Sequence, residues 1–69
     1  LVYMISYEPL WNTLKKKNRS TYYISHNGFL SRSIIHKLKH NEVVTTKTID
    51  TLCNILDCNV EDVMIYIKD

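Results

Sequence analysis

The fold is decided by residues 20–39, which read STYYISHNGFLSRSIIHKLK. Ser20 can cap a helix that runs to about Asn27, because a serine hydroxyl can accept a hydrogen bond from a free N–H group of the first turn. Ser31 can cap a second helix, which is predicted over Arg32–Lys39. Residues 20–39 therefore predict two short helices in close succession.

The connection between these two helices is very short. Gly28 closes the first helix, since glycine readily adopts the left-handed conformation that ends many helices. The apolar residues Phe29 and Leu30 follow, and both are expected to dock into the core. In the second helix Ile35 and Leu38 are expected to face inward. Two helices joined by three or four residues that include glycine have the spacing of a helix-turn-helix.

The residues before this motif predict a strand and a helix. Leu1–Tyr7 is rich in β-branched and aromatic residues and lacks a helical period, which is typical of a short strand. Glu8-Pro9 marks a helix start, because proline fits the first helical position, where its missing N–H group is not needed. The helix is expected to end in Lys15–Lys17, since cations suit the C-terminal end of the helix dipole.

The residues after the motif predict two more helices. Thr45 or Thr46 can cap a fourth helix, whose apolar residues recur with helical spacing: Ile49, Leu52, Cys53 and Leu56. Asn59 can cap a short fifth helix, with Asp62 as its capping-box partner. Its inward residues are expected to be Val60, Val63, Met64 and Ile67. Met64–Lys68 could instead finish as a strand. The predicted fold is all-α, with five helices and a short N-terminal strand.

Charge is strongly segregated along the chain. Seven of the nine lysines and arginines fall between Lys15 and Lys39, and no aspartate or glutamate occurs from Pro9 to Asn41. All three histidines lie in the same stretch, whereas the following residues carry six acids against two lysines. This distribution fits a surface that binds a polyanion, most often nucleic acid. A solvated basic face that balances an acidic one is the alternative.

Length and composition exclude several classes of protein. The 69 residues are enough for one domain, over 1–69, and leave no room for an elaborate enzyme cleft, so no enzymatic activity or cofactor is expected. The longest apolar runs are too short to span a bilayer. The sequence gives no evidence of a small-molecule ligand. Two cysteines do not make a disulfide framework. We therefore expect a cytoplasmic protein.

The chain resembles the Cro/repressor-type helix-turn-helix family, which has the lambda-repressor-like fold, and most closely its small bacterial regulators. The resemblance is carried by MISYEPLW at 4–11, LSRSIIHKLKHN at 30–41, VTTKTIDTLCNILDC at 44–58 and VEDV at 60–63. It implies sequence-specific binding of double-stranded DNA by a transcriptional regulator, usually a repressor. The family places its turn glycine one residue later than Gly28, at the position of Phe29, and this departure bears on the geometry of the turn.

The resemblance also implies which residues contact DNA. It places base contacts on the helix after the turn, at Arg32, Ser33, His36 and Lys37. An arginine in the first turn of such a helix can donate two hydrogen bonds to guanine. Backbone phosphates are expected to be contacted by Ser20, Thr21, Ser31, Lys39, His40 and Lys17. Hydroxyls and free N–H groups at a helix N-terminus suit phosphate, because that end of the helix carries partial positive charge. A solvated helix face is the alternative for both sets.

Other interpretations remain open at the level of sequence. His36, His40, Cys53 and Cys58 together imitate a four-ligand zinc set, but Cys53 belongs to the inward stripe of its helix, so no metal is expected. A protein-interaction module, such as an antirepressor or antitoxin-like partner, could keep the fold without reading DNA. A homodimer is expected, because one small domain covers only one half-site. Its candidate surface comprises Leu1–Tyr7 and Met64–Ile67.

Overall fold

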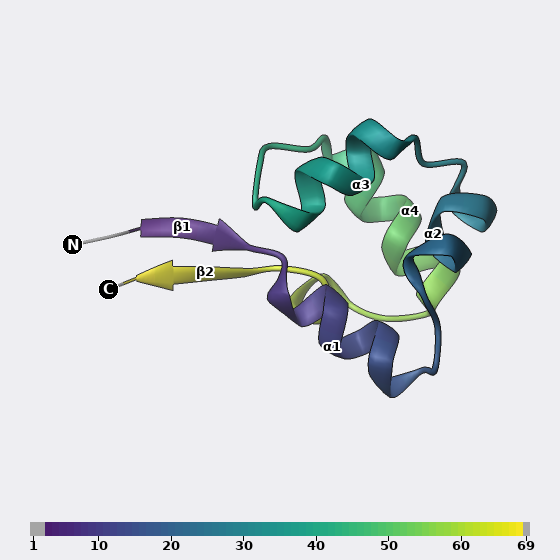
Figure 1. Cartoon of the computed structure of the whole chain (residues 1–69). Helices are drawn as coiled ribbons and strands as arrows, with labels where there is room; N and C mark the ends of the chain where they lie inside the picture. Colours follow the sequence, from purple (N-terminus) through teal and green to yellow (C-terminus); the bar gives the residue numbers. More distant parts are fainter. Residues whose placement is uncertain (1–2, 69) are drawn as a thin grey trace.

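In the part of the chain that the structure describes, four α-helices are preceded by one strand and followed by another, and the two strands pair antiparallel (Figure 1). The structure is a computed structural model and describes residues 3–68. The elements in chain order are β1 (Tyr3–Ser6), α1 (Glu8–Lys16), α2 (Thr21–Gly28), α3 (Arg32–Lys39), α4 (Thr46–Leu56), the 3-10 turn η1 (Val60–Asp62) and β2 (Ile65–Lys68). Within the described range, no helix is long and apolar enough to cross a membrane.

The helix starts agree with the predictions made from capping residues. The Ser31 hydroxyl accepts a hydrogen bond from the Ile34 N–H group at 3.3 Å. At α4 it is Thr45, not Thr46, whose hydroxyl accepts from Thr48 N–H at 3.3 Å. Ser20 occupies the N-cap position of α2, but its side chain makes no capping bond. Local sequence signals thus position α3 and α4 to within a residue.

Every helix contributes to one apolar core. Its buried side chains are Tyr7, Leu10, Leu14, Ile24, Leu30, Leu38, Ile49, Leu52, Leu56 and Val63. Gly28 allows α2 and α4 to approach closely, because a Cβ atom at this position would lie 3.1 Å from Thr51 Cγ2 and 3.3 Å from Ile55 Cδ1. The Thr13 hydroxyl of α1 donates to the Asp62 carbonyl of η1 at 2.7 Å. The close approach at Gly28 holds α2 against α4, and the Thr13 bond holds α1 against η1.

The prediction of a fifth α-helix was wrong, and the alternative of a terminal strand is correct. Only one 3-10 turn forms at Val60–Asp62, where the Asn59 N–H group donates to the Asp62 carboxylate at 3.1 Å. Val63 is buried as expected, but Val60 is 49% and Ile67 39% exposed. The β-branched residues that follow satisfy their backbone by pairing with β1, so the chain leaves the helical conformation.

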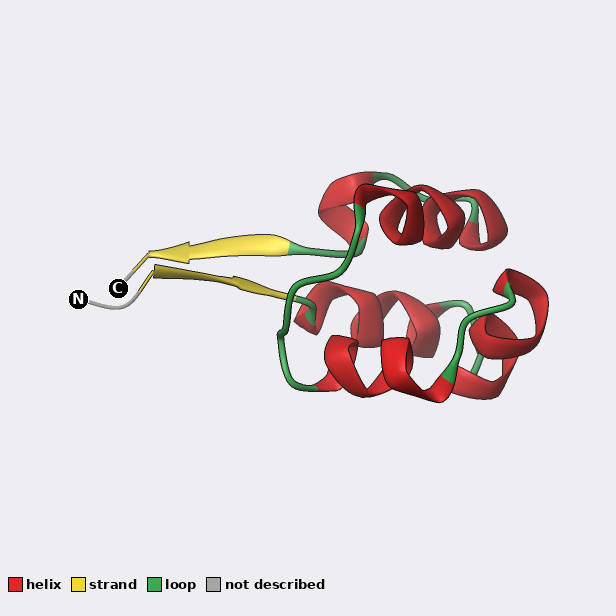
Figure 2. Ribbon diagram, turned by 90° about the horizontal axis from the view of Figure 1, so that it is seen from above, coloured by secondary structure: helices red, strands yellow, loops and turns green. Residues whose placement is uncertain are grey.

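The paired strands β1 and β2, called the terminal ribbon below, project away from the helices (Figure 2). The strand predicted over Leu1–Tyr7 is seen as Tyr3–Ser6, and Leu1 and Val2 lie outside the described residues. Tyr7 follows the strand and is the buried N-cap residue of α1. Its N–H group donates to Asn41 Oδ1 at 3.0 Å, and its hydroxyl donates to the Glu42 carbonyl at 2.9 Å. The base of the ribbon is therefore tied to the loop after α3.

The expectation for Phe29 was also wrong. Gly28 remains in α2, and Phe29 takes the left-handed conformation, with φ 54° and ψ 37°. The Phe29 side chain is 93% exposed, whereas Leu30 is buried at 8%. The left-handed residue ends α2 where the family usually has glycine, and the chain then turns so that only Leu30 enters the core. Phe29 is therefore strained, because a residue with a Cβ atom is disfavoured in the left-handed conformation.

Candidate nucleic-acid interface

α3 has one exposed side and one packed side. Leu38 is fully buried, and Ile34 and Ile35 are half-buried against the core. The remaining side chains are exposed: Arg32, Ser33, His36, Lys37, Lys39 and His40. All four residues predicted to contact bases therefore lie on the solvent side of one helix. This side is basic and carries hydrogen-bond donors, which are the groups that read the edges of guanine and adenine.

The turn between α2 and α3 is held by two hydrogen bonds between the same pair of residues. The Ser25 hydroxyl donates to the Leu30 carbonyl at 3.1 Å, and the Leu30 N–H group donates to the Ser25 carbonyl at 3.1 Å. Sequence reasoning missed this role of Ser25. Since Ser25 lies on α2 and Leu30 immediately precedes the Ser31 cap, the two bonds fix where α3 begins relative to α2.

The residues predicted to contact phosphates lie at the ends of three helices. Lys17 follows α1, Ser20 and Thr21 begin α2, and Ser31, Lys39 and His40 lie at the two ends of α3. All of them are exposed except Thr21, which is half-buried. The Ser20 hydroxyl is not used for capping, whereas that of Ser31 is already engaged by Ile34. The Ser20 hydroxyl is thus available to a phosphate beside the partly positive N-terminus of α2. The Ser31 hydroxyl has less hydrogen-bonding capacity left, because it already accepts a bond from Ile34.

A further cation, which sequence reasoning expected only to add long-range attraction, lies beside the start of α2. The guanidinium carbon of Arg19 lies 4.4 Å above the centre of the Tyr23 ring, which is a cation–π geometry. The contact holds a long side chain next to Ser20 and Thr21. In the sequence, Tyr23 follows Arg19 by four residues, a spacing that places both side chains on one side of a helix. The spacing alone does not show that the ring is oriented to receive the cation.

An acidic side chain approaches α3 from the loop that follows it. Asn41 adopts a left-handed conformation with φ 56°, and the Glu42 N–H group donates to the Lys37 carbonyl at 2.8 Å. The chain therefore folds back, and a Glu42 carboxylate oxygen lies 4.0 Å from His36 Nε2. The His36 ring also lies 4.2 Å, centre to centre, from that of His40. The basic side of α3 is thus bounded by one carboxylate.

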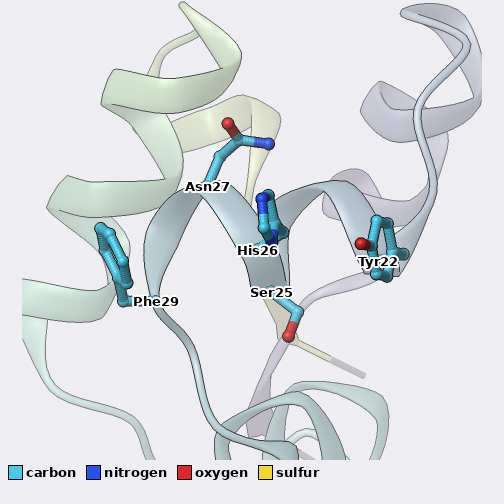
Figure 3. Close-up of a pocket in the computed structure, with 5 residues that line it drawn as sticks. All are labelled: Tyr22, Ser25, His26, Asn27 and Phe29. Atoms are coloured by element: carbon cyan, nitrogen blue, oxygen red, sulfur yellow. The ribbon is translucent and has the colours of Figure 1, made fainter.

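The outer side of α2 carries an open hollow of about 480 Å³ (Figure 3). It is lined by Tyr22, Ser25, His26, Asn27 and Phe29. The rings of Tyr22 and His26 stack at 5.6 Å, but Asn27, Ser25 and Phe29 point in different directions around the helix. Because these side chains do not converge on one point, the hollow lacks the arrangement of an acid, a base and a nucleophile that catalysis needs.

The four residues of the imitated zinc set have different surroundings. His36 and His40 lie on the exposed side of α3, whereas Cys53 and Cys58 are half-buried against the core. Burial, together with the nearby Cys53 and Asp62, raises the pKa of Cys58 to about 11, which opposes the thiolate that a metal requires. Among residues 3–68, no three histidine, cysteine or acidic side chains are grouped to hold a metal ion.

Comparison with known proteins identifies a family and a solved structure of similar fold. The family model of the Cro/C1-type helix-turn-helix DNA-binding domain matches residues 9–69. The fold is similar to the crystal structure of the transcriptional regulator VanUg, form II, with a TM-score of 0.91 and 23% sequence identity. That match covers 100% of this chain and 92% of the other. A search of curated proteins gives no match.

Proposed function

Because the chain belongs to the Cro/C1-type helix-turn-helix family of DNA-binding domains, we propose that it is a sequence-specific regulator that reads the major groove with α3. Arg32, Ser33, His36 and Lys37 contact base edges in this proposal. One observation carries it: all four are exposed on the side of α3 opposite the buried Leu38. A helix presented in this way, after a tight turn, fits the major groove of B-DNA.

The phosphate contacts follow from the same orientation. Thr21 and Ser20 bring the N-terminus of α2 to the backbone, where its partial positive charge and hydroxyls suit a phosphate oxygen. Lys17, Lys39 and His40 add positive charge, and Ser31 contributes its remaining hydrogen-bonding capacity. These contacts set the position of the protein on the duplex and carry no sequence information themselves.

Residues 1–69 act as one DNA-binding domain in this proposal, and two copies occupy a symmetric operator. A single recognition helix distinguishes few base pairs, so a pair of domains on two half-sites supplies the discrimination that a regulator needs. Repression by blocking access of polymerase is the simplest outcome, since operator occupancy alone achieves it.

The test begins with selection of bound sequences from a random pool of duplex DNA. Arg32→Ala should lose about 1–3 kcal/mol on the selected site and little on random DNA, so the specificity ratio falls. Lys16→Ala is the matched control, because this exposed lysine ends α1 and lies outside the proposed base contacts. It should weaken both DNAs alike and lower the salt slope by about one ion at most.

Two results would refute the assignment. One is a failure to enrich any sequence, and the other is wild-type affinity of both Arg32→Ala and His36→Ala for the selected site at high salt. Either result would leave a protein-interaction module as the better explanation of the fold.

A further inference from the structure

The exposed side of α3 combines hydrogen-bond donors with a carboxylate. Each of the four side chains proposed to contact bases can donate a hydrogen bond, which suits the acceptor atoms of guanine. The ionised carboxylate of Glu42 can only accept. One of its oxygens lies 4.0 Å from His36 Nε2, so the carboxylate reaches the same side of the helix. The proposed reading surface therefore includes a group of the opposite hydrogen-bonding character.

The backbone of Glu42 is held from two sides. Asn41 reverses the chain with its left-handed conformation, and the Glu42 N–H group then donates to the Lys37 carbonyl at 2.8 Å. The Glu42 carbonyl accepts the Tyr7 hydroxyl at 2.9 Å. Both bonds use backbone atoms of Glu42, so a substitution of its side chain leaves them in place. The start of this side chain is thus fixed relative to α3.

The Glu42 carboxylate is able to accept a hydrogen bond from DNA. Its distance of 4.0 Å from His36 Nε2 is longer than a hydrogen bond, so the contact does not use up its acceptor capacity. The side chains of His36 and Glu42 are 64% and 52% exposed. Successive base pairs are separated by about 3.4 Å along the duplex. A group this close to His36 therefore faces the base pair that His36 faces, or an adjacent one.

We propose that Glu42 is a specificity-determining residue that selects cytosine in the major groove. This assignment rests on the proposed function, because it needs α3 to lie in that groove. There cytosine presents an N4 amino donor, whereas guanine and thymine present acceptors. Adenine has an amino donor, but its N7 acceptor lies beside it and repels a carboxylate. Since an unpaired charge is costly to bury, Glu42 acts against the other bases as well as in favour of cytosine.

The experiment selects duplex DNA from a random pool with wild type and with variants of the full chain. Wild type should enrich cytosine at one position, at or next to the position that His36→Ala relaxes. Glu42→Gln should replace this cytosine by adenine, because glutamine keeps the size of the side chain and can form paired hydrogen bonds with adenine N6 and N7. Glu42→Ala should leave the position without a preference.

Glu61→Gln is the matched control. It makes the same change at an exposed glutamate of η1, which is bonded to α1 and not to α3. It also removes one negative charge, so it reports any effect of net charge alone. This variant should enrich the same sequence as wild type. Circular dichroism checks that all variants fold.

Two duplexes that differ only at the selected base pair give the size of the effect. At a salt concentration that suppresses non-specific binding, wild type should bind the cytosine duplex at least about fivefold more tightly than the adenine duplex. Glu42→Gln should bind the adenine duplex at least as tightly as the cytosine duplex. The ratio of the two dissociation constants is the measured quantity, so a uniform change in affinity does not affect it.

The outcomes separate this assignment from the proposed function. If wild type enriches a sequence and both Glu42 variants enrich the same one, the assignment fails and the DNA-binding proposal stands. A wild-type sequence without cytosine at or next to the position read by His36 also overturns it. So does a Glu61→Gln variant that changes the selected base as Glu42→Gln does. If wild type enriches no sequence at all, the proposed function fails, and the assignment of Glu42 fails with it.

Discussion

Replacing Phe29 by glycine should make the protein more stable, although it removes the whole side chain. Phe29 has φ 54° and ψ 37°, a region in which a residue with a Cβ atom pays about 1–2 kcal/mol. Its ring is 93% exposed, so the substitution removes almost no buried apolar area. Glycine gives the unfolded chain more freedom, which offsets about 0.4–1 kcal/mol of the gain. The expected net stabilisation is about 0.5–1 kcal/mol.

Urea unfolding followed by circular dichroism measures this change, and thermal unfolding should show a rise of about 2–8 °C for a domain of this size. Phe29→Ala is the matched control, because alanine removes the ring but keeps the Cβ atom and its strain. It should leave the free energy of unfolding within about 0.5 kcal/mol of wild type. If both variants lose 1 kcal/mol or more, the ring supports the fold and the argument from backbone strain is wrong.

Further predictions concern the turn, the bounding acid and the half-buried thiol of Cys58. Ser25→Ala should cost about 1 kcal/mol of stability, measured by urea unfolding, because it removes the hydroxyl bond to the Leu30 carbonyl. Glu42→Gln should tighten DNA binding about two- to fivefold at low salt, since it removes the carboxylate 4.0 Å from His36. If titration with DNA gives the same dissociation constant for Glu42→Gln and wild type, Glu42 lies outside the interface. The raised pKa of Cys58, about 11 against an ordinary 9.0, predicts slow alkylation by iodoacetamide at pH 8. Because the thiol is a weaker acid in the fold than in the unfolded chain, its contribution to stability is complete below pH 9 and is lost as the pH rises to about 11. Cys58→Ala should remove that part of the pH dependence in thermal unfolding.

Helix positions were predictable where a short-range signal decides them. The caps at Ser31 and Thr45 act within three residues of the helix start, so the boundaries of α3 and of α4 follow from neighbouring residues. The end of the chain depends on a partner more than fifty residues away. Met64–Lys68 has a sequence compatible with helix or strand, and only the pairing with β1 selects the strand. No local pattern contains that information.

The same distinction applies to the candidate interface. The exposed side of α3 was predictable because Ile35 and Leu38 define its inward side by helical period. The exposure of Phe29 was not, because it depends on which residue of the turn takes the left-handed conformation. The approach of Glu42 to His36 was also missed, since it needs the chain to reverse at Asn41. The left-handed conformations of Phe29 and Asn41 thus determine these two features, and the helical period of the sequence does not predict them.

Asn41 links the end of α3 to the base of the terminal ribbon. Its left-handed conformation turns the chain at the end of α3, and its side-chain oxygen accepts the Tyr7 N–H group at 3.0 Å. Tyr7 in turn joins the terminal ribbon to α1, and its hydroxyl bonds the Glu42 carbonyl. The base of the ribbon is therefore held at a fixed position relative to α3.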